Sequence, residues 1–280
     1  MSTRRISIWL TRLVISAAFA TGMIYMVNRH LHGALVSSIG RYRNLRVLTW
    51  NIGKLYLPID SRAADRDLRH VAKVIEETGA HVVALQELKG PTQLGRLLAL
   101  LGPAWHGRVP QDAYDRRPAL ITRLPARFIE LMTSTGRAAQ AAELTMPGGE
   151  KLIAASIHLD AFDAERRTRQ IEEIINGLNH FRRSDVLLAG DFNFDAIQLE
   201  RGSPEHRLYL HLSRTMIDAG RHAGGTTLIS QRLDYVFYRI GWIERTDAHV
   251  LRGRRINIMD HDPLLVELAL RASVRPPPQP

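Results

Sequence analysis

The chain has 280 residues, of which 45% are hydrophobic, and it contains no cysteine. This length and composition suit one large folded domain or two small ones and exclude a disordered chain. The lack of cysteine excludes disulfide bonds and thiolate metal sites. The formal net charge of +10 is unevenly spread, since residues 1–46 hold seven arginines and no acid and residues 47–280 carry the remaining +3. The folded part is therefore only mildly basic.

An apolar segment near the N-terminus predicts a membrane anchor. Leu13–Val27 contains no charged residue, and extending it back over residues 6–27 gives the length of about 20 residues that a spanning helix needs. The extension includes Arg12, whose long side chain can reach the membrane interface. A cleaved signal peptide is the alternative, with Arg4 and Arg5 before the apolar run and a cleavage site at "AFA". We favour the uncleaved anchor because the run stays apolar beyond this site.

The arginines on either side of the apolar segment bear on membrane topology. Arg4, Arg5 and Arg12 favour a cytoplasmic N-terminus and hence a folded domain outside the cytoplasm, whereas four arginines on the other flank favour the reverse. We expect a membrane-anchored protein with an extracytoplasmic domain, and secretion after signal cleavage is the alternative. The expected organisation is an anchor or signal segment with a basic linker over 1–44, one domain over 45–271 and a disordered tail over 272–280.

Hydrophobic periodicity predicts the elements of the folded domain in chain order. The predicted strands cover residues 45–53, 80–88, 118–123, 127–132, 141–146, 151–159, 185–191, 232–240 and 263–270. The predicted helices cover residues 65–79, 91–102, 163–181 and 203–220. Strands outnumber helices and the helices lie between them, which favours two packed sheets with helices on their outer faces.

Polar side chains gather where the predicted strands begin or end. They are Asn51, Glu87, His158, Asp191, Asn193, Asp234, Asp260 and His261. Each alone has an ordinary explanation, such as a turn-forming asparagine or a solvated strand end. Together they offer carboxylates, amides and two imidazoles without a thiol, and oxygen-rich sets of this kind suit Mg²⁺ or Mn²⁺. A histidine beside an aspartate suits acid–base work, so the set predicts metal-assisted phosphoester hydrolysis.

Six sequence blocks carry a family resemblance. In chain order they are "TWNI", "LQEL", "SIHLD", "GDFN", "RLDYVF" and "DHDPLLVEL", spread over roughly residues 45–270. This ordered set resembles the endonuclease/exonuclease/phosphatase superfamily, which includes deoxyribonucleases, apurinic-site endonucleases, sphingomyelinases and inositol-polyphosphate phosphatases. The resemblance implies an α+β fold, a four-layer α/β/β/α sandwich with two mixed β-sheets. It also implies a phosphoester substrate, an Mg²⁺ or Mn²⁺ cofactor and a site at one end of the sheets.

The resemblance implies a metal side of this site. Glu87 corresponds to the main carboxylate ligand of the divalent metal, and Asp260 to a second carboxylate on the same side. Asn51 corresponds to a residue that lies near both the metal and the phosphate. We therefore expect Asn51, Glu87 and Asp260 to surround the cation.

The remaining residues correspond to groups that act on water and phosphate. Asp191 would orient or deprotonate the attacking water, and Asn193 would donate to the phosphate. His261 would contact the phosphate and transfer a proton, with Asp234 fixing its tautomer. His158 would stabilise the charge that builds on the phosphoryl oxygens.

The substrate class stays open at this point, because one fold supports several functions. An anchored phosphodiesterase acting on lipid or extracellular nucleic acid is one hypothesis, and a DNA nuclease is the second. The third is a binding module without chemistry, which the presence of the full polar set disfavours. The uneven charge disfavours a nuclease that depends on many phosphate contacts. We expect a membrane-tethered, metal-dependent phosphoester hydrolase, and no obligate protein partner is evident.

Overall fold

The structure is a computed structural model that describes residues 44–53, 61–111, 117–134, 138–178, 185–256 and 261–271. It divides the chain into two units, Met1–Tyr42 and Arg43–Pro280, and every described residue belongs to the second. The expected anchor and the expected tail lie outside the described residues. Within the described ranges, no helix is long and apolar enough to cross a membrane.

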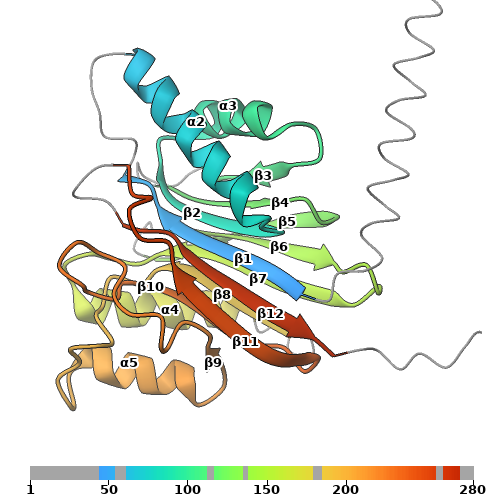
Figure 1. Cartoon of the computed structure of the whole chain (residues 1–280). Helices are drawn as coiled ribbons and strands as arrows, with labels where there is room; N and C mark the ends of the chain where they lie inside the picture. The colour runs from blue at the N-terminus through green and yellow to red at the C-terminus, as the bar shows by residue number, and fades with distance from the viewer. Residues whose placement is uncertain are drawn as a thin grey trace, which may run out of the picture. The chain divides into compact units, whose positions relative to one another are not determined.

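The first of two β-sheets contains the first and last strands of the folded unit (Figure 1). Its order is β11-β12-β1-β2-β4-β3. The strands are β1 (Asn44–Asn51), β2 (Val82–Leu88), β3 (His106–Arg108), β4 (Arg117–Thr122), β11 (Ile243–Val250) and β12 (Leu264–Leu270). β1 and β2 run parallel, and the other neighbours are antiparallel.

The second sheet is formed by the middle of the chain, in the order β5-β6-β7-β8-β10-β9. Its strands are β5 (Ala126–Met132), β6 (Ala138–Thr145), β7 (Lys151–His158), β8 (Asp185–Asp191), β9 (Ile217–Asp218) and β10 (Asp234–Arg239). Here β7 and β8 form the parallel pair, and the other neighbours are antiparallel. The two sheets face each other, since β2 contacts β7 and β1 contacts β8.

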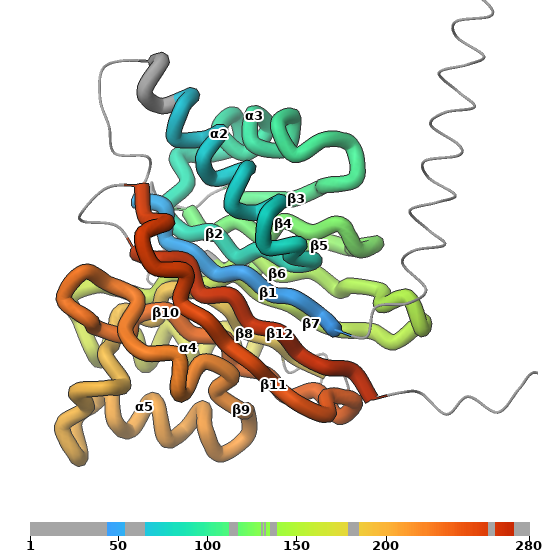
Figure 2. Tube along the Cα trace, in the orientation of Figure 1, coloured from blue at the N-terminus to red at the C-terminus, as the bar shows by residue number. Residues whose placement is uncertain are grey.

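Within the described residues, helices cover the outer faces of both sheets (Figures 1 and 2). α2 (Ser61–Thr78) and α3 (Pro91–Leu101) pack on the first sheet, and α4 (Ala164–Leu178) and α5 (Pro204–Ser213) pack on the second. Alternate strand residues face the helices and the opposite sheet, because side chains alternate across a strand. The predicted four-layer α/β/β/α sandwich with two mixed sheets is confirmed.

The predicted helix over residues 203–220 is wrong in its last third. α5 ends at Ser213, and Ile217 and Asp218 instead form β9 against Tyr238 and Phe237. The apolar residues of this stretch fit a helical period, but pairing with the edge of the second sheet satisfies their backbone groups instead.

Two strands of the first sheet were not predicted. β3 has only three residues, and β11 reads "IERTDAHV", with polar side chains at most positions. Both are edge strands, and half of the residues of β11 are exposed. An edge strand that faces water lacks the continuous apolar run that marks a buried strand, so hydrophobicity alone could not reveal it.

Gly190 allows the two parallel strands that end at the site to approach closely. Its φ is 156°, and a Cβ at this position would lie 2.0 Å from the carbonyl oxygen of Ile157. We expect Gly190→Ala to destabilise the fold by about 3 kcal/mol through overpacking and backbone strain. The free energy of unfolding measured by urea denaturation tests this. Gly95→Ala is the control, because Gly95 is in α3 with open space around its Cβ position, and it should be neutral or stabilising. Equal stabilities of the two variants would contradict the packing argument.

His81 makes the stability depend on pH. Burial, with the guanidinium groups of Arg123 and Arg46, lowers the pKa of His81 to about 3, and its Nδ1 accepts from the backbone N–H of Arg46 at 2.9 Å. Between about pH 3 and pH 6.5, His81 is protonated in the unfolded chain but neutral in the folded chain. The stability that neutral His81 contributes to the folded chain is therefore lost as pH falls from about 6.5 towards 3. We expect the free energy of unfolding of His81→Asn to fall by about 3 kcal/mol less than that of the native protein between pH 7 and pH 4. Urea denaturation across this range tests it, with His249→Asn on β11 as the control. A slope unchanged in His81→Asn would contradict the argument.

Candidate active site

The polar residues predicted from the sequence that lie within the described ranges meet at one end of the two sheets. Asn51 ends β1, and Glu87 lies one residue before the end of β2. His158 and Asp191 end the parallel strands β7 and β8 and are register partners, and Asp191 also pairs with Asp234 at the start of β10. Three neighbouring strands of the second sheet thus place an imidazole and two carboxylates side by side.

A hydrogen bond joins the two sheets at this end. The Nδ2 of Asn51 donates to Oδ2 of Asp191 at 2.9 Å, and the Oδ1 of Asn51 accepts from the backbone N–H of Gly53 at 3.0 Å. Both side chains are buried. This contact fixes the end of β1 against the end of β8, so the predicted metal side and water side form one site.

Glu87 is aimed into the site by an irregularity of β2. The register between β2 and β4 shifts between Leu85 and Leu88, and Glu87 has a φ of 65°. A bulge redirects a side chain, and a positive φ is uncommon outside glycine and concentrates at functional sites. The carboxylate of Glu87 lies 4.0 Å from Nε2 of His158, which lies 3.6 Å from Oδ2 of Asp191.

His261 and Asp234 form a closely paired unit. The Nδ1 of His261 lies 2.7 Å from Oδ2 of Asp234, and Nε1 of Trp50 donates to the backbone carbonyl of His261 at 2.9 Å. Burial by itself lowers the pKa of His261, but the carboxylates of Asp234, Asp191 and Glu87 outweigh it and raise the pKa to about 10. With Nδ1 bound to Asp234, a charged imidazole keeps a proton on Nε2 to offer to a ligand.

Asp191 lies at the centre of the cluster. Burial raises its pKa, against the opposing effect of the imidazoles of His261 and His158. Its Oδ1 accepts from the backbone N–H of Asn193 at 2.8 Å, and the side chain of Asn193 donates to the carbonyl of Leu159 at 3.0 Å. Asn193 has a φ of 53°, a second strained residue beside Glu87. A buried carboxylate with a raised pKa is a better proton acceptor than an ordinary aspartate.

Several residues that hold this arrangement were missed from the sequence. Thr226 is fully buried, its hydroxyl accepts from the backbone N–H of Asp234 at 3.4 Å, and its carbonyl accepts from the N–H of Asp262 at 2.8 Å. Asp262 is also fully buried and forms an ion pair with Arg255, which fixes the chain next to His261. Trp50 and Asp262 lie within the motifs "TWNI" and "DHDPLLVEL", whereas nothing in "GGTT" marks Thr226.

The donor set suits a hard divalent cation. Glu87, Asp191 and Asp234 are buried carboxylates at one end of the sheets, and Asn51 adds an amide oxygen. Oxygen ligands of this kind are those of Mg²⁺ and Mn²⁺, and buried anions in excess of cations favour a positive ligand. Within the described ranges, no three histidine or acidic side chains are placed to hold a metal by themselves. Asp260, the second expected ligand, lies outside them.

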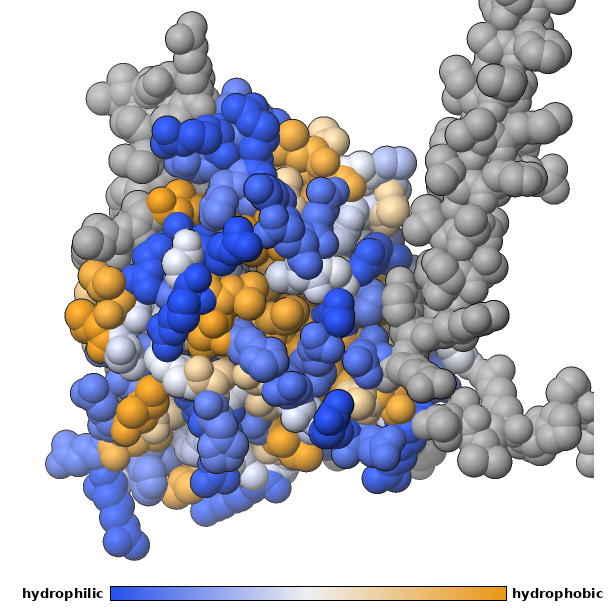
Figure 3. All heavy atoms as spheres, in the orientation of Figure 1, coloured by the Kyte–Doolittle hydropathy of each residue, from blue (hydrophilic) through white to orange (hydrophobic). Residues whose placement is uncertain are grey.

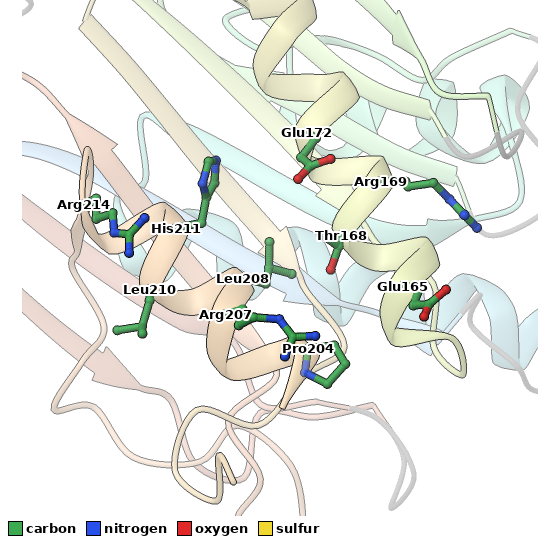
Figure 4. Close-up of a pocket in the computed structure, with 10 residues that line it drawn as sticks. All are labelled: Glu165, Thr168, Arg169, Glu172, Pro204, Arg207, Leu208, Leu210, His211 and Arg214. Atoms are coloured by element: carbon green, nitrogen blue, oxygen red, sulfur yellow. The ribbon is translucent and has the colours of Figure 1, made fainter. Parts of the chain in front are cut away.

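A separate groove of about 540 Å³ lies between α4 and α5, on the outer face of the second sheet (Figure 4). Its walls carry the side chains of Arg169, Arg207 and Arg214 and of Glu165 and Glu172. These side chains come from the helical layer and do not converge on one point, and none belongs to the polar set at the strand ends. We therefore take the strand ends, and not this groove, as the candidate active site.

The family follows from the match of the sequence to a known family. Residues 48–252 match the Endonuclease/Exonuclease/phosphatase family. The chain belongs to this family. Members of the family are phosphoester hydrolases, generally dependent on a divalent metal, so the chain is assigned to the phosphoesterase and nuclease type of hydrolase. A search of curated proteins finds no match.

Solved structures of the endonuclease/exonuclease/phosphatase family share the fold. A protein of the family from Beutenbergia cavernae is 20% identical, with a TM-score of 0.65 over 82% of this chain and 72% of that one. TDP2 from Caenorhabditis elegans is 15% identical, with a TM-score of 0.63 over 81% and 74%. A mannosyl-6-phosphatase from Bacteroides thetaiotaomicron is 17% identical, with a TM-score of 0.61 over 80% and 99%. At these identities the similarity shows the fold alone.

Proposed function

We propose that the protein is a Mg²⁺- or Mn²⁺-dependent phosphoester hydrolase of the phosphodiesterase type, with its catalytic domain tethered to a membrane. One observation carries the catalytic part: the His261–Asp234 pair, the buried Asp191 and the redirected Glu87 lie together at one end of the two sheets. A proton donor, a proton acceptor and an oxygen ligand for a cation are the groups that phosphoester hydrolysis by water needs.

The proposed metal ligands are Glu87, Asp260 and Asn51, and Asp260 is proposed from the sequence because it lies outside the described residues. A divalent cation bound there supplies positive charge to the phosphoryl oxygens as negative charge develops on them. The Asn51–Asp191 hydrogen bond of 2.9 Å couples this side to the residues that handle water. Loss of the Asn51 amide would therefore disturb both sides at once.

The remaining residues move protons and orient the phosphate. Asp191 takes a proton from the attacking water as the water oxygen forms a bond to phosphorus. The bond from phosphorus to the leaving oxygen breaks, and that oxygen takes a proton from Nε2 of His261, while Asp234 holds the opposite ring nitrogen. His158 and Asn193 donate to the phosphoryl oxygens and stabilise the charge that builds there.

The tether is proposed from the sequence. Leu13–Val27 is free of charge and is flanked by arginines on both sides, as membrane segments commonly are. The arginines before it support a cytoplasmic N-terminus and an extracytoplasmic catalytic domain. Protease protection of the chain in sealed membrane vesicles tests this orientation, because only a domain on the outer side of the vesicle is digested.

A substrate panel tests the proposed activity. The full chain in detergent is assayed with Mg²⁺ against duplex DNA, RNA, phospholipid, inositol phosphates and bis(p-nitrophenyl) phosphate. Sugar phosphates belong in the panel as monoesters, because one structure of the same fold is named a mannosyl-6-phosphatase. Hydrolysis of at least one phosphodiester is expected, and no turnover of any member would overturn the proposal.

DNA is the second candidate substrate, favoured by the three arginines Arg252, Arg254 and Arg255 beside the motif "DHDP". Two of them, Arg252 and Arg255, form ion pairs with the buried Asp262, and Arg254 pairs with Glu77. Their charge is thus partly neutralised within the protein. A nuclease that relied on many phosphate contacts would lose affinity steeply with salt, with a log–log slope of about −0.9 per contact. We expect weak duplex binding with a shallow salt dependence.

A further inference from the structure

Four large apolar side chains are exposed at the end of the second sheet that carries the site. Phe162 is 94% exposed, Ile197 54%, Leu228 55% and Ile229 71%. They lie on three loops, which follow β7, follow β8 and precede β10. These are the strands that supply the imidazole and the two carboxylates of the second sheet. We call Phe162, Ile197, Leu228 and Ile229 the apolar rim.

The three loops of the apolar rim lie next to one another. The side chain of Asn193, in the loop after β8, donates to the carbonyl of Leu159 in the loop after β7 at 3.0 Å. On its other side, Asp195 accepts from the backbone N–H of Arg232, in the loop before β10, at 3.1 Å. Figure 3 shows apolar atoms at the left edge of the molecule, where Figure 1 draws the loop before β10. The rim therefore borders the site along one side.

Local hydrogen bonds hold these loops in the conformation that exposes the apolar side chains. The buried carboxylate of Asp160 accepts from the N–H of Phe162 at 2.9 Å, and the carboxylate of the half-buried Asp195 accepts from the N–H of Ile197 at 2.9 Å. Ser230 adopts a φ of 62°, a strained value that the tip of the loop before β10 tolerates. Four solvated hydrophobic side chains on ordered loops beside one site indicate a contact surface.

We infer that the apolar rim is a membrane-contact surface, which seats the catalytic end of the domain on a phospholipid bilayer. This inference rests on the proposed function, because it supposes that the site takes a phosphoester. A protein docked on the rim would cover one side of the route to His261. A bilayer instead offers its phosphoesters in the headgroup layer, while side chains such as Phe162 enter the apolar layer beneath.

Cationic side chains beside the rim fit the phosphates of lipid headgroups. Arg252 lies beside Gly224 of the loop before β10 and is about half exposed, but it pairs with Asp262 and so adds only part of its charge. Arg221 and His222 are exposed on the same loop. Long basic side chains next to apolar ones are typical of proteins at a membrane interface.

The proposed tether is long enough for this contact. Figure 1 shows β1 running away from its start at Asn44 towards the site end at Asn51. The strand covers roughly 26 Å at about 3.3 Å per residue, so the tether joins the domain at the end opposite the site. The 16 residues 28–43, between the apolar segment and β1, have a contour length of roughly 50 Å at about 3.3 Å each, which exceeds the length of β1.

The absence of cysteine makes a site-specific probe experiment possible. Single-cysteine variants Phe162→Cys and Ile229→Cys, and the control Leu100→Cys on the outer face of α3, are made in the full chain. Each is labelled with an environment-sensitive fluorophore and reconstituted into phosphatidylcholine vesicles with and without brominated acyl chains. We expect a blue shift and bromine quenching at positions 162 and 229 and neither at position 100.

The outcomes separate membrane contact from catalysis. Rim probes that behave like the probe at position 100 would overturn the inference, whatever the activity. Rim probes shielded without vesicles, together with a doubled mass in light scattering, would assign the rim to a second copy and also overturn it. Quenched rim probes in a chain that hydrolyses no phosphoester would leave the contact standing and overturn the proposed function alone. If both hold, Phe162→Ser combined with Ile229→Ser should lower phospholipid turnover in vesicles relative to bis(p-nitrophenyl) phosphate turnover by about tenfold.

Discussion

His261→Ala is expected to lower kcat for phosphodiester hydrolysis by about 10³-fold, within the range of 10²–10⁴ typical of acid–base groups. The Nδ1 of His261 lies 2.7 Å from Asp234, whose carboxylate orients the ring and favours its charged form. Asp234→Asn keeps the shape and removes the charge, so it should cost about 10²-fold or more. Steady-state kinetics on the best substrate of the panel measures both. His249→Ala, at an exposed position of β11, is the matched control.

The two effects should not multiply, because residues that act as a unit give non-additive losses. The double variant of His261 and Asp234 should be about as slow as His261→Ala alone. If the two losses multiply in the double variant, the residues act independently and the pairing has no role in catalysis.

Glu87→Gln is expected to raise the Mg²⁺ concentration for half-maximal activity by about 100-fold, since even outer-shell partners of a metal contribute 10–100-fold to affinity. The substitution keeps the size of the side chain at a position where the backbone has a φ of 65°, so the fold should survive. Activity measured across a Mg²⁺ titration checks this, with circular dichroism as the folding control. Glu165→Gln, exposed on α4, is the matched control. A titration curve identical to that of the native protein would exclude Glu87 as a ligand.

Much of the fold was predictable from the sequence because its central strands are buried on both faces. Segments such as "DVLLAGD" carry continuous apolar runs that end in polar residues, and they correspond to β8 with Asp191 at its end. The edges were less predictable. β11 is an edge strand with polar residues at most positions, several of them exposed to water. The short β9 lies where the apolar residues continue at helical spacing past the end of α5 at Ser213. Water-facing strands do not need the hydrophobic run by which strands are recognised.

The composition of the candidate site was predictable, but its geometry was not. Six ordered motifs name residues without saying how the two sheets are placed, and the Asn51–Asp191 hydrogen bond depends on that placement. The bulge that redirects Glu87 and the support of Asp234 by Thr226 arise from backbone geometry. Local sequence does not determine contacts between residues far apart in the chain. The placement of Asp260 stays a prediction, because it lies outside the described residues.

Strain and close packing gather where the chemistry is proposed. Glu87 and Asn193 both have positive φ values, and Gly190 allows a backbone approach that no other residue permits beside Asp191. Such features persist only where the surrounding structure holds them. In this protein the sandwich supplies that support, because the buried strands β2 and β8 carry the strained residues or lead directly into them.

Removal and return of the metal shows whether hydrolysis depends on a divalent cation. The full chain is assayed on its best phosphodiester with Mg²⁺, then with excess chelator, and then after Mg²⁺ is restored. We predict hydrolysis with Mg²⁺, none with chelator and full recovery on restoration, with Asp191→Asn inactive throughout although folded. Equal hydrolysis with and without chelator, or full activity of Asp191→Asn, would contradict the proposed metal-dependent attack by water.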